Sequence, residues 1–118
     1  MNVSFDGINS TIVTFMASGK IAIGDLVSVC ENSTVKKSAD NEPFIGICTS
    51  VQNDLVAVQI SGFATIKINS TEDVKYGLQN FISDENSSLK ICKSEEAIAI
   101  PLNVISIDST ESTISVFL

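Results

Sequence analysis

The stretch that decides the fold class is residues 44–60, which read FIGICTSVQNDLVAVQI. Two apolar segments, Phe44–Val51 and Leu55–Ile60, flank the polar turn Gln52-Asn53-Asp54. Branched apolar residues are frequent in both segments, and apolar and polar residues alternate in parts of them, as in strands that show one face to a core. Asn and Asp favour a turn between strands because their side chains hydrogen-bond the local backbone. The stretch therefore predicts a β-hairpin.

The same pattern recurs along the chain and predicts an all-β protein of about nine short strands. Beyond the hairpin, we expect strands at Thr11–Met16, Leu26–Cys30, Ala64–Ile68, Tyr76–Ile82, Leu89–Cys92, Asn103–Ile107 and Thr113–Phe117. Only Ser70–Lys75 could hold a helical turn. A length of 118 residues fits a single domain, residues 1–118, with one core. The expected architecture is a small β-barrel or a β-sandwich.

A weak internal repeat relates residues 20–68 to residues 74–118. Gly24–Val29 followed by Glu31–Lys36 resembles Gly77–Ile82 followed by Glu85–Lys90. Each half is expected to run as a strand, a polar turn, a short strand ending near a lysine, an acidic loop and a closing hairpin. The repeat indicates either an old duplication or two successive β-meanders built by the same turn rules.

Composition excludes several classes of function. The chain has no His, and all seven basic residues are Lys, against fourteen acidic residues, which gives a net charge of −7. A chain of this charge is repelled by phosphate backbones and anionic lipid, and it lacks the Arg used for bidentate base readout. We therefore expect neither nucleic acid nor a membrane as a partner.

The N-terminal residues lack the basic and apolar regions of a signal peptide, and the longest apolar run, Ala97–Ile100, is too short to span a membrane. Synthesis in the cytoplasm without secretion by a signal peptide is the expectation. Three widely spaced cysteines, Cys30, Cys48 and Cys92, each lie in an apolar stretch. An odd number at this spacing predicts buried free thiols rather than a disulfide framework.

Candidate catalytic and cofactor sites are weak. Without His, acid–base chemistry needs a perturbed carboxylate or Lys, and the doublets Glu72-Asp73, Asp84-Glu85 and Glu95-Glu96 fall in polar segments. Adjacent residues on a strand point to opposite faces, so these doublets are expected to be solvated rather than convergent. No pair of closely spaced cysteines indicates a transition-metal site. The acidic stretches Asp40–Glu42 and Asp84–Asn86 offer hard oxygen ligands, but they lack the ligand spacing of a calcium loop. We predict a non-enzymatic protein without a cofactor.

Large apolar side chains lie near both ends of the chain, where polar residues are usual. These candidate interface residues are Phe5, Ile8, Ile12, Phe15, Phe117 and Leu118. They either fill the core through strands at both termini or pack against a neighbouring subunit, as in a homo-oligomer.

Four motifs in the first half carry a family resemblance. In order, they are Gly24-Asp25-Leu26-Val27-Ser28-Val29, Thr34-Val35-Lys36-Lys37-Ser38-Ala39-Asp40, Pro43-Phe44-Ile45-Gly46-Ile47-Cys48 and Leu55-Val56-Ala57-Val58-Gln59-Ile60-Ser61-Gly62. In this order they resemble bacteriophage head-decoration proteins and related prophage capsid-accessory families, up to about Ile68. Gly24 and Asp25 are expected to set a corner, Gly46 to let a strand bend, and Gly62 to end one. The second half departs from the pattern at Pro101-Leu102-Asn103.

The resemblance implies a β-barrel-like virion protein on the capsid surface that binds the major capsid protein and clusters as a homotrimer. A second hypothesis is a β-sandwich module that binds carbohydrate or a receptor on a phage or cell-surface structure. Such sites stack sugars on exposed aromatic rings, and the chain offers Tyr76 and six Phe. A hydrolase that uses turn carboxylates is a third, weaker hypothesis.

Overall fold

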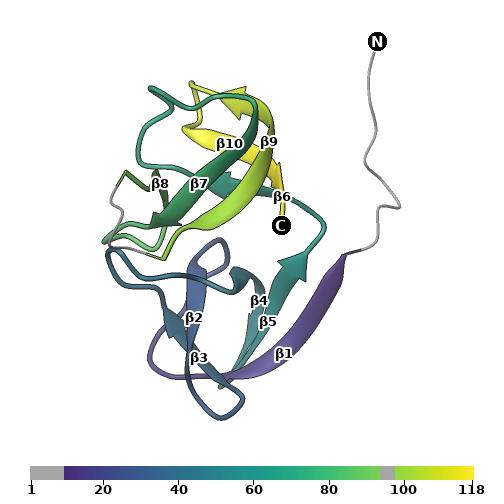
Figure 1. The fold of residues 1–118 in the computed structure, drawn as a ribbon. Helices are drawn as coiled ribbons and strands as arrows, with labels where there is room; N and C mark the ends of the chain where they lie inside the picture. The colour runs from purple at the N-terminus through teal and green to yellow at the C-terminus, as the bar shows by residue number, and fades with distance from the viewer. Residues whose placement is uncertain (1–9, 94–97) are drawn as a thin grey trace.

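The computed structural model describes residues 10–93 and 98–118 and is all-β: ten strands and no helix within these ranges. The strands form two groups, a closed barrel and a second five-stranded sheet, which stack one above the other (Figure 1). No helix in the described residues is long and apolar enough to cross a membrane. The ten strands, in a barrel and a second sheet, confirm the expected all-β fold class.

The barrel contains the first five strands. They are β1 (Thr11–Ala17), β2 (Leu26–Glu31), β3 (Thr34–Lys37), β4 (Gly46–Gln52) and β5 (Leu55–Ser61). Four of the contacts between neighbouring strands are antiparallel, and β1 closes the barrel by running parallel to β3. The hairpin expected from residues 44–60 is β4–β5, and it turns at Asn53, which has a φ of 56°.

The second group contains the last five strands. They are β6 (Phe63–Lys67), β7 (Gly77–Ser83), β8 (Leu89–Ile91), β9 (Ile100–Asp108) and β10 (Thr113–Phe117). Their order in the sheet is β6-β10-β9-β7-β8, with every neighbouring pair antiparallel. A parallel bridge from Ile68, just after β6, to Leu89 on β8 links the two edges of this sheet.

The two groups share one topology. When β6–β10 are matched in order to β1–β5, every strand pairing of the barrel has a counterpart in the second unit. This includes the parallel contact between the first and third strands, which is β1 with β3 in the barrel and the bridge from Ile68, just after β6, to β8 in the second unit. Their turns also correspond, because positive φ angles recur at Gly24 and Gly77, 95° and 84°, and at Ser33 and Ser87, 54° and 58°. The shared strand order with left-handed residues at matching turns fits both a duplication and two successive meanders built by the same turn rules.

The unit boundary differs from the one expected from the sequence. β6 pairs with β10, so it belongs to the second unit, whereas the repeat between residues 20–68 and 74–118 placed it in the first. Two strands differ from the expected list: β3 was not in it, although the repeat predicts it as the short strand that ends near a lysine, and β9 begins at Ile100 rather than Asn103. Pro101 is tolerated in β9 because β10 pairs only as far as Asn103, which leaves β9 unpaired on one side there. Residues 70–75 form a turn, in which the Val74 N–H donates to the Thr71 carbonyl, and not a helix.

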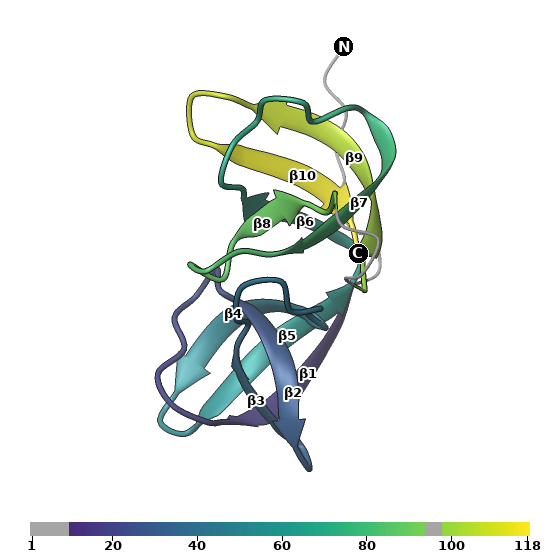
Figure 2. The ribbon, with the colours of Figure 1, turned by 60° about the vertical axis from the view of Figure 1, so that its left-hand side comes forward.

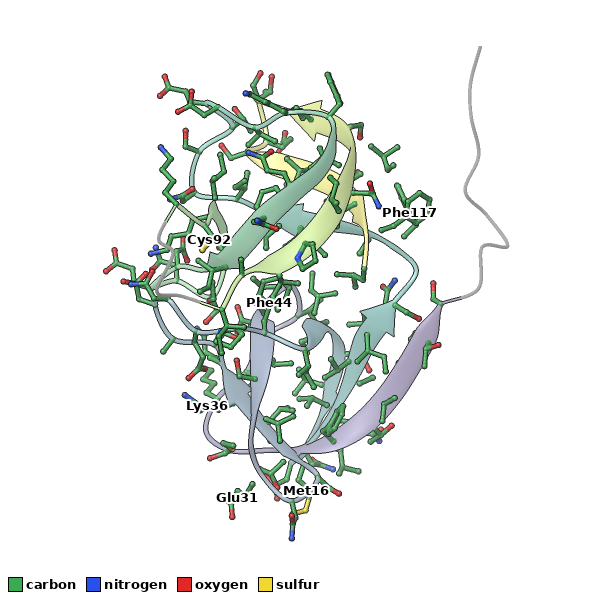
Figure 3. All side chains as sticks on the ribbon, viewed as in Figure 1. Met16, Glu31, Lys36, Phe44, Cys92 and Phe117 are labelled. Atoms are coloured by element: carbon green, nitrogen blue, oxygen red, sulfur yellow. The ribbon has the colours of Figure 1, made fainter. Side chains whose placement is uncertain are left out.

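A core shared by both units holds them together. Leu26, Phe44 and Ile47 from the first unit pack with nine buried side chains of the second. Figure 3 shows Phe44 between the barrel and the upper sheet. The adjacent residues Val27 and Cys48 point the other way and belong to a smaller cluster inside the barrel. The ends of β2 and β4 are thus buried on both faces, which explains their continuous apolar runs.

Buried serines add polar contacts across the same junction. The Ser38 carbonyl accepts hydrogen bonds from the Ser87 and Ser83 hydroxyls, at 2.8 and 3.4 Å. The Leu26 N–H donates to the Ser87 carbonyl at 2.9 Å, and the Asn41 N–H donates to the Ser83 carbonyl at 2.9 Å. These bonds satisfy backbone groups that would be costly to leave unpaired in the interior, so they fix the β7–β8 hairpin against the loop after β3.

Candidate interaction surfaces

The glycine and aspartate of the first motif build a corner at the entrance to β2. Gly24 has a φ of 95°, a conformation that favours glycine, and its N–H donates to the Cys48 carbonyl at 2.9 Å. The Asp25 carboxylate accepts the Ala22 N–H at 2.8 Å and lies 3.6 Å from the Lys37 ammonium group. This corner is structural, because the polar atoms of Asp25 are used within the turn and with a neighbouring strand.

Gly46 lies where β4 meets β5. A Cβ atom there would collide with the Gln59 carbonyl oxygen and would lie 2.9 Å from a methyl group of Val58. Gly62, with a φ of 96°, ends β5 and begins the link to β6, and its carbonyl accepts the Leu118 N–H at 2.9 Å. Gly46 and Gly62 therefore have structural roles in the fold.

The acidic stretches are engaged in structure. In the described residues, no group of three or more His, Cys, Asp or Glu side chains is arranged to hold a metal ion. One oxygen of the buried Asp84 carboxylate accepts the N–H groups of Asn86 and Ser88 at 2.8 and 2.9 Å. Asp40 forms an ion pair with Lys90 at 2.6 Å. Glu95-Glu96 lies outside the described residues.

Among the described residues, Glu42 and Cys48 have pKa values shifted from their ordinary range. Burial tends to raise the pKa of Glu42, but hydrogen bonds from the Lys36 ammonium group at 3.1 Å and the Ala39 N–H at 3.2 Å favour the carboxylate and lower the pKa overall. Burial, together with the negative charge of Asp25, raises the pKa of the Cys48 thiol. A carboxyl group held ionised and a thiol held neutral both suit structural positions, since neither is poised to exchange a proton near neutral pH.

The cysteines are free, as the sequence predicts, but they are not all buried. Cys48 lies in the barrel interior, Cys92 is half-buried, and Cys30 is exposed. Cys30 lies at an irregularity in the pairing of β2 with β3, between Val29 and Glu31, and its thiol donates weakly to the Thr34 carbonyl at 3.6 Å. The apolar residues near Cys30 in the sequence do not indicate that its side chain is exposed.

The candidate interface residues divide between core and surface. Phe15 and Leu118 are partly buried against the two apolar clusters. The ring of Phe117 meets that of Phe63 edge to face at 5.9 Å. Ile12 is 55% exposed. Phe5 and Ile8 lie outside the described residues.

Ile12 forms part of an exposed apolar surface whose other members, Met16 and Leu55, were not among the residues predicted for an interface. Met16, 54% exposed, lies on the same side of β1, and its neighbour across the strand pair is Leu55, 48% exposed. We call Ile12, Met16 and Leu55 the β1 face. Figure 3 shows Met16 at the end of the barrel farthest from the second unit. The alternation along β1 places Ile12, Thr14 and Met16 on one face and the inward residues on the other. The sequence alone does not show which of the two faces points inward.

Several clefts open on the surface of the described residues, two of which are lined by exposed apolar side chains. One lies at the junction of the units, is mainly apolar, and includes Ile23, Ile47 and Phe63 in its lining. The other lies on the second unit beside Tyr76 and Leu78, which are 71% and 70% exposed, with Lys75 and Lys93 at its margin.

No protein-family model matches the chain, and no curated protein matches its sequence.

Proposed function

We propose that this protein is a non-enzymatic structural component of a bacteriophage or prophage virion, which decorates or stabilises the capsid by binding the major capsid protein. The observation that carries the proposal is that the four motifs resembling head-decoration proteins fall together in one barrel. They supply β2–β5 and the loops between them, and the glycines among them occupy conformationally demanding positions.

The surface of the barrel supports a binding role. The β1 face exposes three large apolar side chains on a rigid sheet, and two of them are neighbours across paired strands. Apolar side chains grouped on a sheet are typical of protein contacts, whereas scattered ones are ordinary surface. We propose that the β1 face contacts the capsid shell. Self-association also belongs to the proposal, and the resemblance implies a homotrimer on the capsid.

Co-sedimentation with purified capsids of the source phage tests this function. We expect the protein to pellet with capsids and to saturate at a fixed number of copies per capsid. The variant Met16→Lys should bind at least about tenfold more weakly, because an apolar contact is lost and a charge is desolvated. The control Leu78→Lys changes an equally apolar, exposed residue on the second unit and should bind normally. No binding by the folded parent protein would refute the proposal.

The exposed ring of Tyr76 supports a second candidate, a carbohydrate-binding module. The ring adjoins a cleft whose margin carries Asp73, Lys75 and Lys93, and sugars stack on aromatic rings beside polar groups. The Gln79 side chain in this cleft already bonds the backbone of Lys75 and Asp73. A glycan screen with the parent protein and Tyr76→Ala decides between the candidates: glycan binding that depends on the ring would support the module, and no binding would remove it.

A further inference from the structure

Within the described residues, β1 has a hydrogen-bonding edge without a partner strand along most of its length. The Ala17 N–H donates to the Asp54 carbonyl in the direction of β5, whereas the Met16 N–H donates to the Ser33 carbonyl in the direction of β3, each at 2.8 Å. Because backbone groups alternate in direction along an antiparallel pair, Thr14 and Ile12 point the same way as Met16, away from β5.

No strand in the described residues covers this edge beyond Met16. The pairing between β1 and β3 contains only Met16 with Thr34 and Ala17 with Val35. The N–H and C=O groups of Ile12 and Thr14 therefore face outward on the barrel side away from β5. β1 runs along the outside of the barrel in Figure 1 and lies behind β2 and β5 in Figure 2. The sequence of β1, TIVTFMA, contains none of the charges, prolines or glycines that usually protect an exposed edge from pairing.

We propose that β1 is a strand-pairing edge and that its partner is β1 of a second copy of this chain. The outward groups are self-complementary: in an antiparallel arrangement centred on Val13, Ile12 of each copy lies opposite Thr14 of the other. This register forms four backbone hydrogen bonds, and no charged side chains oppose each other within β1. The net charge of −7 opposes pairing only weakly at about 0.15 M salt, where repulsion is screened beyond about 8 Å.

Pairing in this register has a consequence for the barrel surface. The twofold axis runs perpendicular to the joined sheet, so the outer faces of both copies lie on one side. Ile12, Met16 and Leu55 of the two copies then form one apolar surface twice the size of a single β1 face. This inference stands independently of capsid binding, because it depends only on the edge of β1.

Amide hydrogen exchange at low and high protein concentration tests the pairing directly. We expect the Ile12 and Thr14 amides to become protected as concentration rises, while light scattering shows mass increasing from monomer to dimer. The Val13 and Phe15 amides, which point towards β5, should be protected at both concentrations. A constant monomer mass, or an oligomer in which Ile12 and Thr14 still exchange freely, would overturn the proposal. A trimer that forms through another surface, with the Ile12 and Thr14 amides still exchanging freely, would also overturn the proposal.

Two substitutions of Thr14 sharpen the test. Thr14→Pro removes an outward N–H and so two of the four bonds of the pair, and Thr14→Lys places a charge on the edge; each should weaken self-association about tenfold or more. Asn103→Lys is the matched control, because Asn103 is exposed but lies on β9 with neighbours on both sides, Leu78 and Phe117. If Thr14→Pro unfolds, the comparison of Thr14→Lys with the control Asn103→Lys still tests the proposal. Equal self-association of Thr14→Lys and the parent would contradict pairing through β1.

Discussion

Truncating Phe44 tests whether the two units share one core. Phe44 is almost completely buried, lies in the loop between β3 and β4, and packs in the cluster that contains Phe81, Leu89 and Val116 of the second unit. Phe44→Ala removes a buried ring and leaves a cavity, which costs about 3–5 kcal/mol in typical cores. Against a total stability of about 5–15 kcal/mol for a domain of this size, that is a large fraction.

Urea unfolding followed by far-ultraviolet circular dichroism measures the loss. We expect the midpoint to fall with the slope unchanged, in one transition, because truncation at a shared core destabilises both units together. Thermal unfolding should show a decrease in Tm of about 10–20 °C, at about 4 °C for each kcal/mol. The matched variant Phe44→Leu retains most of the apolar volume and should cost less than about 1.5 kcal/mol.

Two results would refute this reasoning. A loss below about 1 kcal/mol for Phe44→Ala would show that the ring is not part of a tightly packed core. A split transition, with hydrogen exchange increased only in the first unit, would show that the units are stabilised independently. The second outcome would also contradict the role of the hydrogen bonds between Ser38 and the β7–β8 hairpin.

Three further predictions concern single side chains. Gly46→Ala should destabilise the protein by about 1–3 kcal/mol or more in urea unfolding, because the added methyl group meets the backbone of β5; an unchanged midpoint would contradict the close approach. The lowered pKa of Glu42 adds stability that is complete above its ordinary value of 4.5 and is lost as pH falls through the folded-state value. Glu42→Gln should therefore reduce the decrease of stability in acid, measured by urea unfolding at several pH values, and an identical pH profile would contradict the assignment. With a thiol-alkylating reagent followed by mass spectrometry, Cys30 should react in the native protein and Cys48 only after unfolding, since Cys48 is buried with a raised thiol pKa; early modification of Cys48 would contradict its burial.

The strand pattern was readable from the sequence because a strand is a local structure. Period-two alternation and turn-forming residues located nine of the ten strands, including the β4–β5 hairpin. β3, which is four residues long, was not in that list, although the repeat predicts it as the short strand that ends near a lysine. Its place in the barrel depends on partners that are distant in the sequence, β1 and β2.

The candidate interface was only partly readable, because exposure depends on which strands cover which faces. Ile12 and Phe15 look alike in the sequence, yet the first is exposed and the second packs against the barrel core. Met16 and Leu55 are 39 residues apart in the sequence, and only strand pairing makes them neighbours.

By itself, the sequence determined an all-β chain with free cysteines and turns at glycine and asparagine, because composition, alternation and turn chemistry act over a few residues. The tertiary structure alone decided that the barrel and the second sheet have the same strand order, that β6 belongs to the second unit, and that β1 keeps an open edge. The physical reason is that strand partners are chosen by hydrogen bonds and packing between segments far apart in the chain, so the same alternating segment can lie in a core, on a face or at an edge.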